Sequence, residues 1–163
     1  MVEIAVVGDT HIPSRASTIP DKFKSRIEEA DITIHTGDFT SQSAYDQIED
    51  LADRFIAVYG NMDPRNLDLA AVETVTVEGQ TFVVTHGTGD LEQYEERVAS
   101  IVSDEASDEA IGIAGHTHEV MDTQVDSIRL LNPGSLTGAD PADKSTMMIL
   151  TVEEGSVDVE VLE

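Results

Sequence analysis

Five short segments of the chain place Asp, Asn or His side chains directly after apolar runs. They are Gly8-Asp9-Thr10-His11, Gly37-Asp38, Gly60-Asn61-Met62-Asp63, Thr85-His86-Gly87 and Gly115-His116-Thr117-His118. Carboxylate, amide and imidazole groups in this mixture are ligands of hard or borderline divalent cations. The number of candidates favours two adjacent metals sharing one carboxylate, an arrangement suited to in-line attack on phosphorus. The candidate ligands are Asp9, His11, Asp38, Asn61, His86, His116 and His118.

The apolar runs in front of these segments predict strands whose carboxyl ends carry the candidates. Strands are expected at residues 2–7, 32–35 and 54–59, with helices at 20–30 and from Ser41 or Ser43 to 51. Strand, helix, strand, helix, strand is typical of a parallel unit with right-handed crossovers. Ligand sites of open α/β sheets lie beyond the carboxyl ends of the strands. The topology therefore supports the same site independently of residue type.

The second part of the chain is expected to contain mostly strands. A hairpin is predicted around Glu78-Gly79-Gln80 and another around Glu153-Glu154-Gly155. A helix is predicted at 91–102, followed by a polar loop at 104–108, and strands at 111–114, 120–125 and 127–131. We expect one domain over residues 1–163, folded as a two-sheet α/β/β/α sandwich with the helices outside.

Composition limits the cellular compartments in which the protein is expected and the types of ligand that a metal site could use. The chain has 163 residues and no cysteine, which excludes disulfides and thiolate ligands. No apolar run approaches the length needed to span a bilayer, so no membrane association is expected. The first residues, Met1 to Asp9, read as a strand and lack the features of a signal peptide. A cytoplasmic protein is the expectation.

The net charge of −24 comes from 33 Asp and Glu against 9 Lys and Arg. We favour a surface adapted to concentrated salt, because molar salt shortens the Debye length to about 3 Å and screens self-repulsion. The alternative is an acidic surface for a basic partner. Nucleic-acid binding is disfavoured in either case, because phosphate contacts need clustered Lys and Arg.

The order GDTH, GD, GN-x-D, THG, GHTH resembles the calcineurin-like metallophosphoesterases. The length of the chain and Asn132-Pro133-Gly134-Ser135 resemble the small single-domain branch of YfcE-like phosphodiesterases, to which Vps29 is related. The resemblance spans residues 4–135 and implies the calcineurin-like metallophosphoesterase fold. One such segment alone would be a weak signal, whereas five in the same order are specific.

The resemblance implies a divalent-metal-dependent phosphodiesterase in which a hydroxide bridging two metals attacks a small phosphate-ester substrate. Manganese is the first expectation, and the ligand set also suits iron, nickel or zinc. The implied catalytic residues are Asp38, Asn61 and Asp63. Metal one would take Asp9, His11, Asp38 and His118, and metal two would take Asp38, Asn61, His86 and His116.

Two departures from the wider family concern the leaving group and the phosphate charge. Many members carry His at the position of Met62, and methionine cannot donate a proton. Relatives often have a basic residue shortly after the Asn-Pro-Gly-Ser segment, and here residues 136–140 contain none. Arg15 and Arg65 are the remaining candidates for neutralising a phosphate, and surface pairing is at least as good an interpretation of either.

Other interpretations stay open from sequence alone. Any single Asp is equally well explained as a helix cap or turn former, and any single His as a core residue. His35, inside a predicted strand, is expected to be structural rather than a ligand. A Vps29-like non-catalytic scaffold is the alternative function, which complete ligand positions disfavour. Relatives often form homo-oligomers, so an oligomer is an expectation of the resemblance only.

Overall fold

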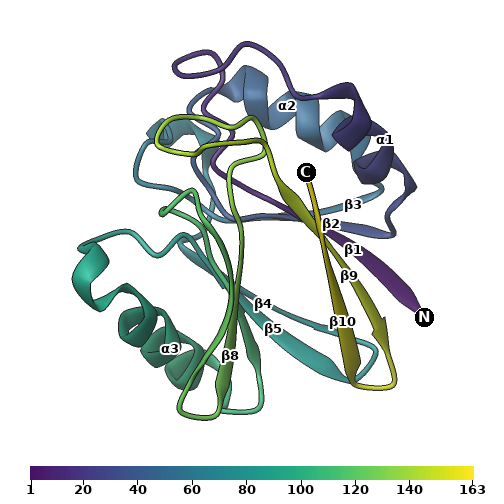
Figure 1. The fold of residues 1–163 in the computed structure, drawn as a ribbon, viewed down its shortest axis with the longest axis vertical. Helices are drawn as coiled ribbons and strands as arrows, with labels where there is room; N and C mark the ends of the chain where they lie inside the picture. Colours follow the sequence, from purple (N-terminus) through teal and green to yellow (C-terminus); the bar gives the residue numbers. More distant parts are fainter.

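The computed structural model of residues 1–163 contains two five-stranded mixed sheets that face each other (Figure 1). The first sheet has the order β10-β9-β1-β2-β3 and the second has the order β4-β5-β6-β8-β7. The strands of the first sheet are β1 (Val2–Val7), β2 (Ile32–His35), β3 (Arg54–Ala57), β9 (Met147–Glu153) and β10 (Ser156–Leu162). Those of the second are β4 (Val72–Val77), β5 (Gln80–Thr85), β6 (Ile111–Ile113), β7 (Val120–Val125) and β8 (Ile128–Pro133).

Three neighbouring strands in each sheet run parallel, which fixes where the loops gather. β1, β2 and β3 are parallel neighbours, with Ile4 opposite Ile32 and Ile32 opposite Arg54. β5, β6 and β8 form the parallel part of the second sheet. Because parallel strands end at the same edge of a sheet, the segments after β1, β2 and β3 start side by side, as do those after β5 and β6.

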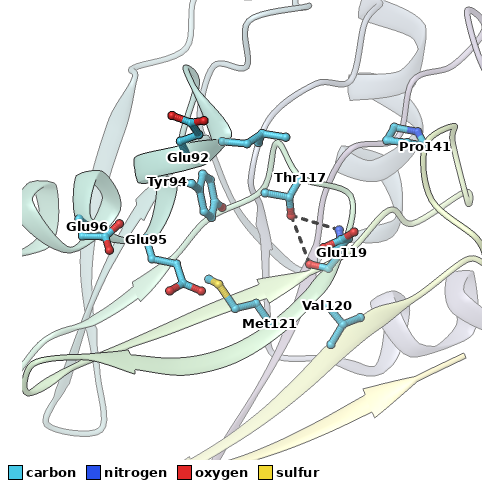
Figure 2. Close-up of a pocket in the computed structure, with 10 residues that line it drawn as sticks. Glu92, Tyr94, Glu95, Glu96, Thr117, Glu119, Val120, Met121 and Pro141 are labelled. Carbon is cyan, nitrogen blue, oxygen red and sulfur yellow. Dashed lines mark hydrogen bonds between the residues drawn. The ribbon is translucent and has the colours of Figure 1, made fainter.

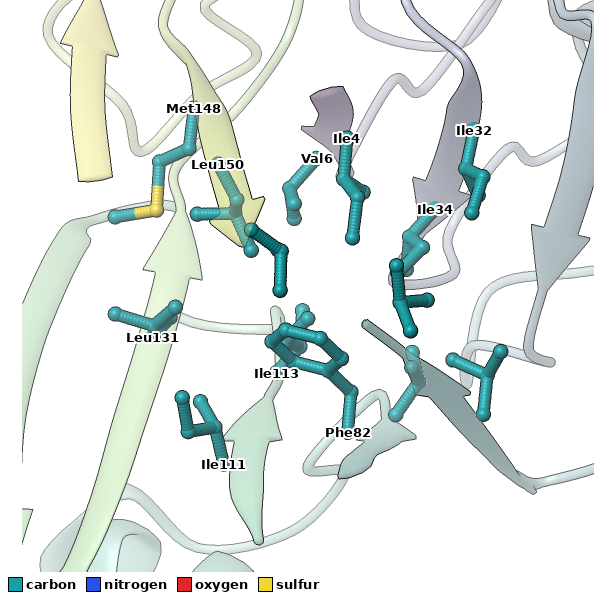
Figure 3. Packing of buried hydrophobic residues seen from close by; sticks show 14 of the residues in the cluster. Ile4, Val6, Ile32, Ile34, Phe82, Ile111, Ile113, Leu131, Met148 and Leu150 are labelled. Atoms are coloured by element: carbon teal, nitrogen blue, oxygen red, sulfur yellow. The ribbon is translucent and has the colours of Figure 1, made fainter. Parts of the chain in front are cut away.

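Alternating side chains fill the space between the sheets (Figure 3). Ile4 and Val6 of β1 point into this layer and meet Phe82 and Ile113 of the second sheet. Ala5, between them in sequence, belongs instead to the layer under the helices. This period of two is the pattern expected for strands covered on both faces.

Helices α1 (Asp21–Glu29) and α2 (Gln42–Leu51) cover the outer face of the first sheet, and α3 (Tyr94–Glu105) covers the second (Figure 1). Helical spacing puts Phe23 and Ile27 of α1 on one buried face. Ser41 caps α2, because its hydroxyl accepts a hydrogen bond from the amide of Ala44. The α/β/β/α sandwich predicted from sequence is therefore confirmed. No helix combines the length and the apolar character that a membrane crossing requires.

Several element boundaries differ from the prediction. β3 ends at Ala57 rather than at residue 59, because the amide of Tyr59 bonds to the carbonyl of Ala70 instead of continuing the ladder. The predicted helix at 91–102 starts as a short 3₁₀ turn, η2 (Leu91–Gln93), before α3. α3 continues to Glu105, into the expected polar loop, and β8 extends to Pro133. A second 3₁₀ turn, η1 (Arg65–Leu67), follows the Asn61 segment.

Candidate metal centre

The predicted ligands lie in loops at the carboxyl ends of strands from both sheets. Asp9 follows β1, Asp38 follows β2, His86 follows β5, and the His116–His118 segment follows β6. Two close groups of potential ligand atoms result, each with all its atoms within 4.8 Å of one another. One group comprises Asp9, His11, Asp38 and His118, and the other comprises Asp38, His86 and His116. Asp38 belongs to both groups, as a bridging carboxylate would.

The shared oxygen of Asp38 lies between imidazole nitrogens of the two groups. Its Oδ2 is 3.4 Å from Nε2 of His11 and 3.1 Å from Nε2 of His86. Neither nitrogen has a hydrogen-bond partner, although both are buried. Two atoms bound to one ion at about 2.1 Å would lie roughly 3.0–3.4 Å apart. The spacing and the unpartnered nitrogens are those of groups directed at a common ion rather than at each other.

Hydrogen bonds to backbone carbonyls fix which imidazole nitrogen is free. Nδ1 of His86 donates to the carbonyl of Thr36 at 2.7 Å, and Nδ1 of His118 donates to the carbonyl of Ala139 at 2.9 Å. Nε2 of each ring therefore keeps its lone pair. In His116 the roles reverse, because Nε2 donates to the carbonyl of Gly89 at 3.1 Å and leaves Nδ1 free. Such outer contacts orient metal-binding histidines in general. The residues present fit divalent ions.

The backbone at the centre is strained in a way that sequence did not reveal. Asp9 and His11 both have φ of 47°, Asp38 has 64°, His116 has 76° and His118 has 62°. Non-glycine residues rarely occupy this left-handed region, and clusters of them mark functional sites. Most other non-glycine residues with positive φ lie in hairpin turns or close to the site. The loops are therefore held in costly conformations where the ligands are needed.

One glycine is required by close approach. A side chain at Gly60 would come within 2.3 Å of the amide nitrogen and Oδ1 of Asp38. The loop after β3 can therefore reach Asp38 only with glycine at this position. The adjoining amide of Met62 donates to Oδ1 of Asp38 at 2.8 Å. That bond leaves Oδ2 as the oxygen facing both groups.

Burial and mutual attraction shift the pKa values of the carboxylates in opposite directions. Burial raises the pKa of Asp9 from 3.8 to about 7. Burial also acts to raise the pKa of Asp38, but contacts with His11 and His86 and the Met62 amide hold it well below its usual range. His86 is buried, which lowers its pKa, but Asp38 and Asp9 outweigh this and raise it. Divalent cations would stabilise both carboxylates as anions.

Asp63, predicted from sequence to be catalytic, is placed as a loop-holding carboxylate. Its Oδ2 accepts from the amides of Asp38 at 2.9 Å and Gly60 at 2.8 Å, and its Oδ1 accepts from Thr40 at 2.8 Å. Burial raises its pKa despite these bonds. Both oxygens are thus engaged with backbone. These bonds hold together the loops that carry Asp38 and Asn61, and a catalytic role for Asp63 stays a prediction.

Asn61 and Met62 lie at the exposed rim of the centre. Asn61 is exposed and sits between Gly60, whose amide donates to the Asp63 carboxylate, and Met62, whose amide donates to the Asp38 carboxylate. Its role as a ligand stays a prediction. The Met62 side chain is 48% exposed and offers no proton to a leaving group. No alternative acid replaces it at this position of the loop.

His35 lies outside both ligand groups. Its Nδ1 accepts from the amide of Gly37 at 2.9 Å, so Nε2 carries the proton and donates to Oγ1 of Thr10 at 2.8 Å. Its ring stacks on Phe39 with centroids 3.6 Å apart. Burial lowers the pKa of His35 well below its usual range, so the ring is neutral. These contacts are those of a structural residue that orders the loops after β1 and β2.

The two arginines considered for phosphate binding differ in placement. Nη1 of Arg15 donates to the carbonyl of Asp140 at 2.8 Å, which ties it to the loop after β8. Arg65 lies in η1 and is exposed. Neither guanidinium pairs with a carboxylate of the centre. Neither arginine therefore offsets the charge of Asp9 or Asp38 by direct pairing.

In the sequence Asn132 is recognised only as part of a family motif, whereas in the structure its side chain holds the loop after β6 through hydrogen bonds. Its Nδ2 donates to the carbonyl of Gly115 and to Oγ1 of Thr117, both at 3.0 Å. Its Oδ1 accepts from the amide of Gly134 at 2.9 Å. The hydroxyl of Tyr94 also donates to the carbonyl of Gly115. Asn132 and Tyr94 thus shape the loop that presents His116 and His118.

A hollow of about 630 Å³ adjoins the centre beside Thr117 (Figure 2). It contains none of the candidate ligands, so it neighbours the centre rather than forming it. A second hollow of about 320 Å³ shares part of its wall and includes His118. The larger hollow is lined by four glutamates together with apolar side chains and has no Lys or Arg among its lining residues. These residues are Leu91, Glu92, Tyr94, Glu95, Glu96, Thr117, Glu119, Val120, Met121 and Pro141.

Residues 2–155 match the calcineurin-like phosphoesterase superfamily domain. A probable metallophosphoesterase of Methanothermobacter thermautotrophicus is 32% identical over 165 residues, covering 98% of this chain and 91% of the relative. A second probable metallophosphoesterase, from Methanocaldococcus jannaschii, is 33% identical over 151 residues, covering 93% of this chain and 76% of the relative.

Solved structures of similar fold include two Vps29 proteins. Vps29 of Chaetomium thermophilum superposes with a TM-score of 0.84 at 22% identity, covering 99% of this chain and 96% of the other. At that identity the likeness concerns the fold alone. Vps29 of Entamoeba histolytica, solved in complex with zinc, has a TM-score of 0.76 at 28% identity and covers 98% of both chains.

Proposed function

The chain belongs to the calcineurin-like phosphoesterase superfamily, and on that basis we propose that it is a divalent-metal-dependent phosphodiesterase. The observation that carries the proposal is the pair of ligand groups that share Asp38. Strained backbone at five candidate ligands and unpartnered nitrogens on His11 and His86 support it, because both features are unfavourable unless ions bind.

Each protein group has a defined task in this proposal. Asp9, His11 and His118 would hold one ion, His86, His116 and the rim residue Asn61 would hold the other, and Asp38 would be shared by both. Ions bound in this way supply Lewis acidity and an activated water for in-line attack on a phosphate ester. The ligand set contains only nitrogen and oxygen, which suits manganese first and iron, nickel or zinc as alternatives.

The chain supplies little beyond the metal ligands for the departing group. Met62 provides no proton, and no arginine of the protein pairs with the centre. General acids typically contribute roughly 10²–10⁴-fold to rate. We therefore expect efficient hydrolysis of esters with good leaving groups and slow hydrolysis of simple alkyl esters. A phosphodiester has one negative charge fewer than a monoester dianion, which favours it at a centre without arginine.

A non-catalytic scaffold is the second candidate, and the fold likeness to Vps29 is what favours it. A scaffold uses the fold for protein contacts and has no need of strained ligands. Ion binding alone does not separate the two candidates, because the Entamoeba histolytica Vps29 was itself solved with zinc. Hydrolysis is the discriminating observation.

The test uses protein stripped of metal and then supplied separately with manganese, nickel, zinc or magnesium in molar potassium chloride. Bis-p-nitrophenyl phosphate and p-nitrophenyl phosphate report diester and monoester cleavage. Metal-dependent cleavage, with faster turnover of the diester, is expected. Asp38→Asn should abolish it, whereas Asp53→Asn, a matched change at an exposed carboxylate, should not. A wild type that binds ions but cleaves neither ester would overturn the proposal in favour of the scaffold.

A further inference from the structure

Ser135 lies where the two sheets meet behind the candidate centre. It follows β8 of the second sheet, and its side chain is fully buried. Its hydroxyl donates to the carbonyl of Asp9, at the end of β1 in the first sheet, at 2.7 Å. The same oxygen accepts from the amide of Ala139 at 2.9 Å. The hydroxyl thus joins the loop after β8 to Asp9, a residue 126 positions earlier in the chain.

Both partners of this hydroxyl lead directly to ligands of one group. Asp9 is itself a candidate ligand, and its carbonyl is the acceptor. Ala139 offers its own carbonyl to Nδ1 of His118 at 2.9 Å. A continuous path therefore runs from the Asp9 backbone through the Ser135 hydroxyl and the Ala139 peptide to the His118 ring. Nε2 of that ring lies 3.6 Å from Oδ1 of Asp9, so the two ends of the path present their ligand atoms to the same ion position.

The path does not include the other group. His86 is oriented by the carbonyl of Thr36 and His116 by the carbonyl of Gly89. Neither carbonyl is bonded to Ser135. Asp38, which is common to both groups, is held by Asp63 and the Met62 amide. The effect of Ser135 should therefore fall on one half of the centre.

Ser135 also secures strained backbone. Asp9 has φ of 47° and His118 has φ of 62°, both in the left-handed region. Such conformations persist only where the surroundings hold them. A serine satisfies a buried carbonyl and a buried amide at once, because a hydroxyl is both donor and acceptor. Alanine would leave both groups unpaired inside the protein.

We propose that Ser135 is a positioning residue that sets the relation of Asp9 to His118 and so determines ion affinity at the Asp9, His11, Asp38 and His118 group. The inference rests on the proposed ion binding, and it assigns to Ser135 a selective influence on one of two ion positions. Loss of an outer contact typically lowers metal affinity roughly 10–100-fold.

The experiment measures binding of manganese to metal-free protein by calorimetry, with bound metal counted by elemental analysis. For Ser135→Ala we expect one of the two ions to bind roughly 10–100-fold more weakly and the other to keep its affinity. Thr146→Val is the matched control. Its hydroxyl is buried and donates to the carbonyl of Pro133 at 2.7 Å, without reaching a candidate ligand. It should bind both ions as the wild type does.

A second measurement needs no metal. Nitrogen NMR of the histidines in metal-free protein should show His118 as the Nδ1–H tautomer in the wild type, because Nδ1 donates to Ala139. In Ser135→Ala the His118 signals should move, while those of His86 stay. If Ser135→Ala does not fold, Ser135→Cys preserves the side-chain volume with a weaker donor and should show smaller changes of the same kind.

The binding measurements distinguish a failure of the two-ion centre from a failure of the role of Ser135. A wild type that binds fewer than two ions removes the two-ion centre itself. A wild type that binds two, with Ser135→Ala equal to it, overturns the role of Ser135 alone. Equal weakening of both ions in Ser135→Ala, or the same weakening in Thr146→Val, would make Ser135 an ordinary contributor to stability.

Discussion

Replacing Asp9 by asparagine should stabilise the metal-free protein, although it removes a predicted ligand. The Asp9 side chain is fully buried, and burial raises its pKa from 3.8 to about 7. The folded pKa lies above the unfolded one, so the folded state binds the proton more tightly. Stability is therefore greatest below about pH 4 and is lost as the pH rises towards about 7. Above that pH the ionised Asp9 costs the metal-free protein up to about 4 kcal/mol.

Thermal unfolding in EDTA and molar potassium chloride measures this cost. Near about pH 8 the metal-free Asp9→Asn protein should melt roughly 10 °C above the wild type, at roughly 2–4 °C per kcal/mol for a chain of this size. Near about pH 5 the difference should shrink, because Asp9 is then protonated in the folded wild type. With manganese at roughly 1,000 times its Kd, the wild type should gain about 4 kcal/mol, which offsets the cost of ionised Asp9 and brings the two melting temperatures together.

Asp53→Asn, at an exposed carboxylate, is the control and should leave the melting temperature unchanged in EDTA. The refuting result is an Asp9→Asn protein that melts below the wild type in EDTA at about pH 8. The carboxylate would then be stabilising without a cation, and the argument that burial makes it costly would fail.

Three further predictions concern the missing proton donor at Met62, the shared carboxylate of Asp38 and the acidic protein surface. Met62→His should raise turnover of alkyl phosphodiesters more than that of nitrophenyl esters, because only alkoxides need a proton donor; an unchanged ratio of the two rates, with equal metal content, would place protonation elsewhere. Asp38→Asn should abolish hydrolysis, whereas His35→Ala should lower the melting temperature and keep activity in the folded fraction; equal activity loss in a folded, metal-bound His35→Ala would contradict the site assignment. The melting temperature should rise from low to multimolar potassium chloride, because a net charge of −24 repels itself in dilute salt. A flat or falling profile would favour a basic partner for the acidic surface.

The layered fold and the location of the centre were predictable because both depend on local patterns. Apolar runs of strand length end at glycine, and helical spacing lies between them. Parallel strands bring their carboxyl ends to one edge, so Asp9 and Asp38 had to be close once β1 and β2 paired. The hairpin around Gly79 followed from its turn residues, and the structure has it between β4 and β5. These local patterns were sufficient to predict the α/β/β/α arrangement.

The supporting contacts were not predictable because they join residues far apart in sequence. The bond from Ser135 to Asp9 spans 126 residues and leaves no local pattern. The resemblance implies a catalytic role for Asp63, which stays a prediction, but no local pattern indicates that both of its carboxylate oxygens accept hydrogen bonds from backbone amides. Positive φ at Asp9 and His118 also has no sequence signal, since aspartate and histidine usually adopt ordinary conformations. Helix α3 continues past its predicted end at residue 102 to Glu105 through exposed residues, which carry no apolar spacing that could have indicated the extension.

Salt and divalent metal should stabilise this protein independently, since they act on different carboxylates. Most acidic side chains are exposed, and molar potassium chloride screens their repulsion beyond about 3 Å. Asp9 is fully buried, so mobile ions do not reach it, whereas a cation bound at the centre offsets its charge. The gain in melting temperature from manganese should therefore be the same in moderate and in concentrated potassium chloride. A manganese effect that disappears at high salt would mean that the metal acts at the exposed surface, as potassium does, and not at the Asp9 and Asp38 centre.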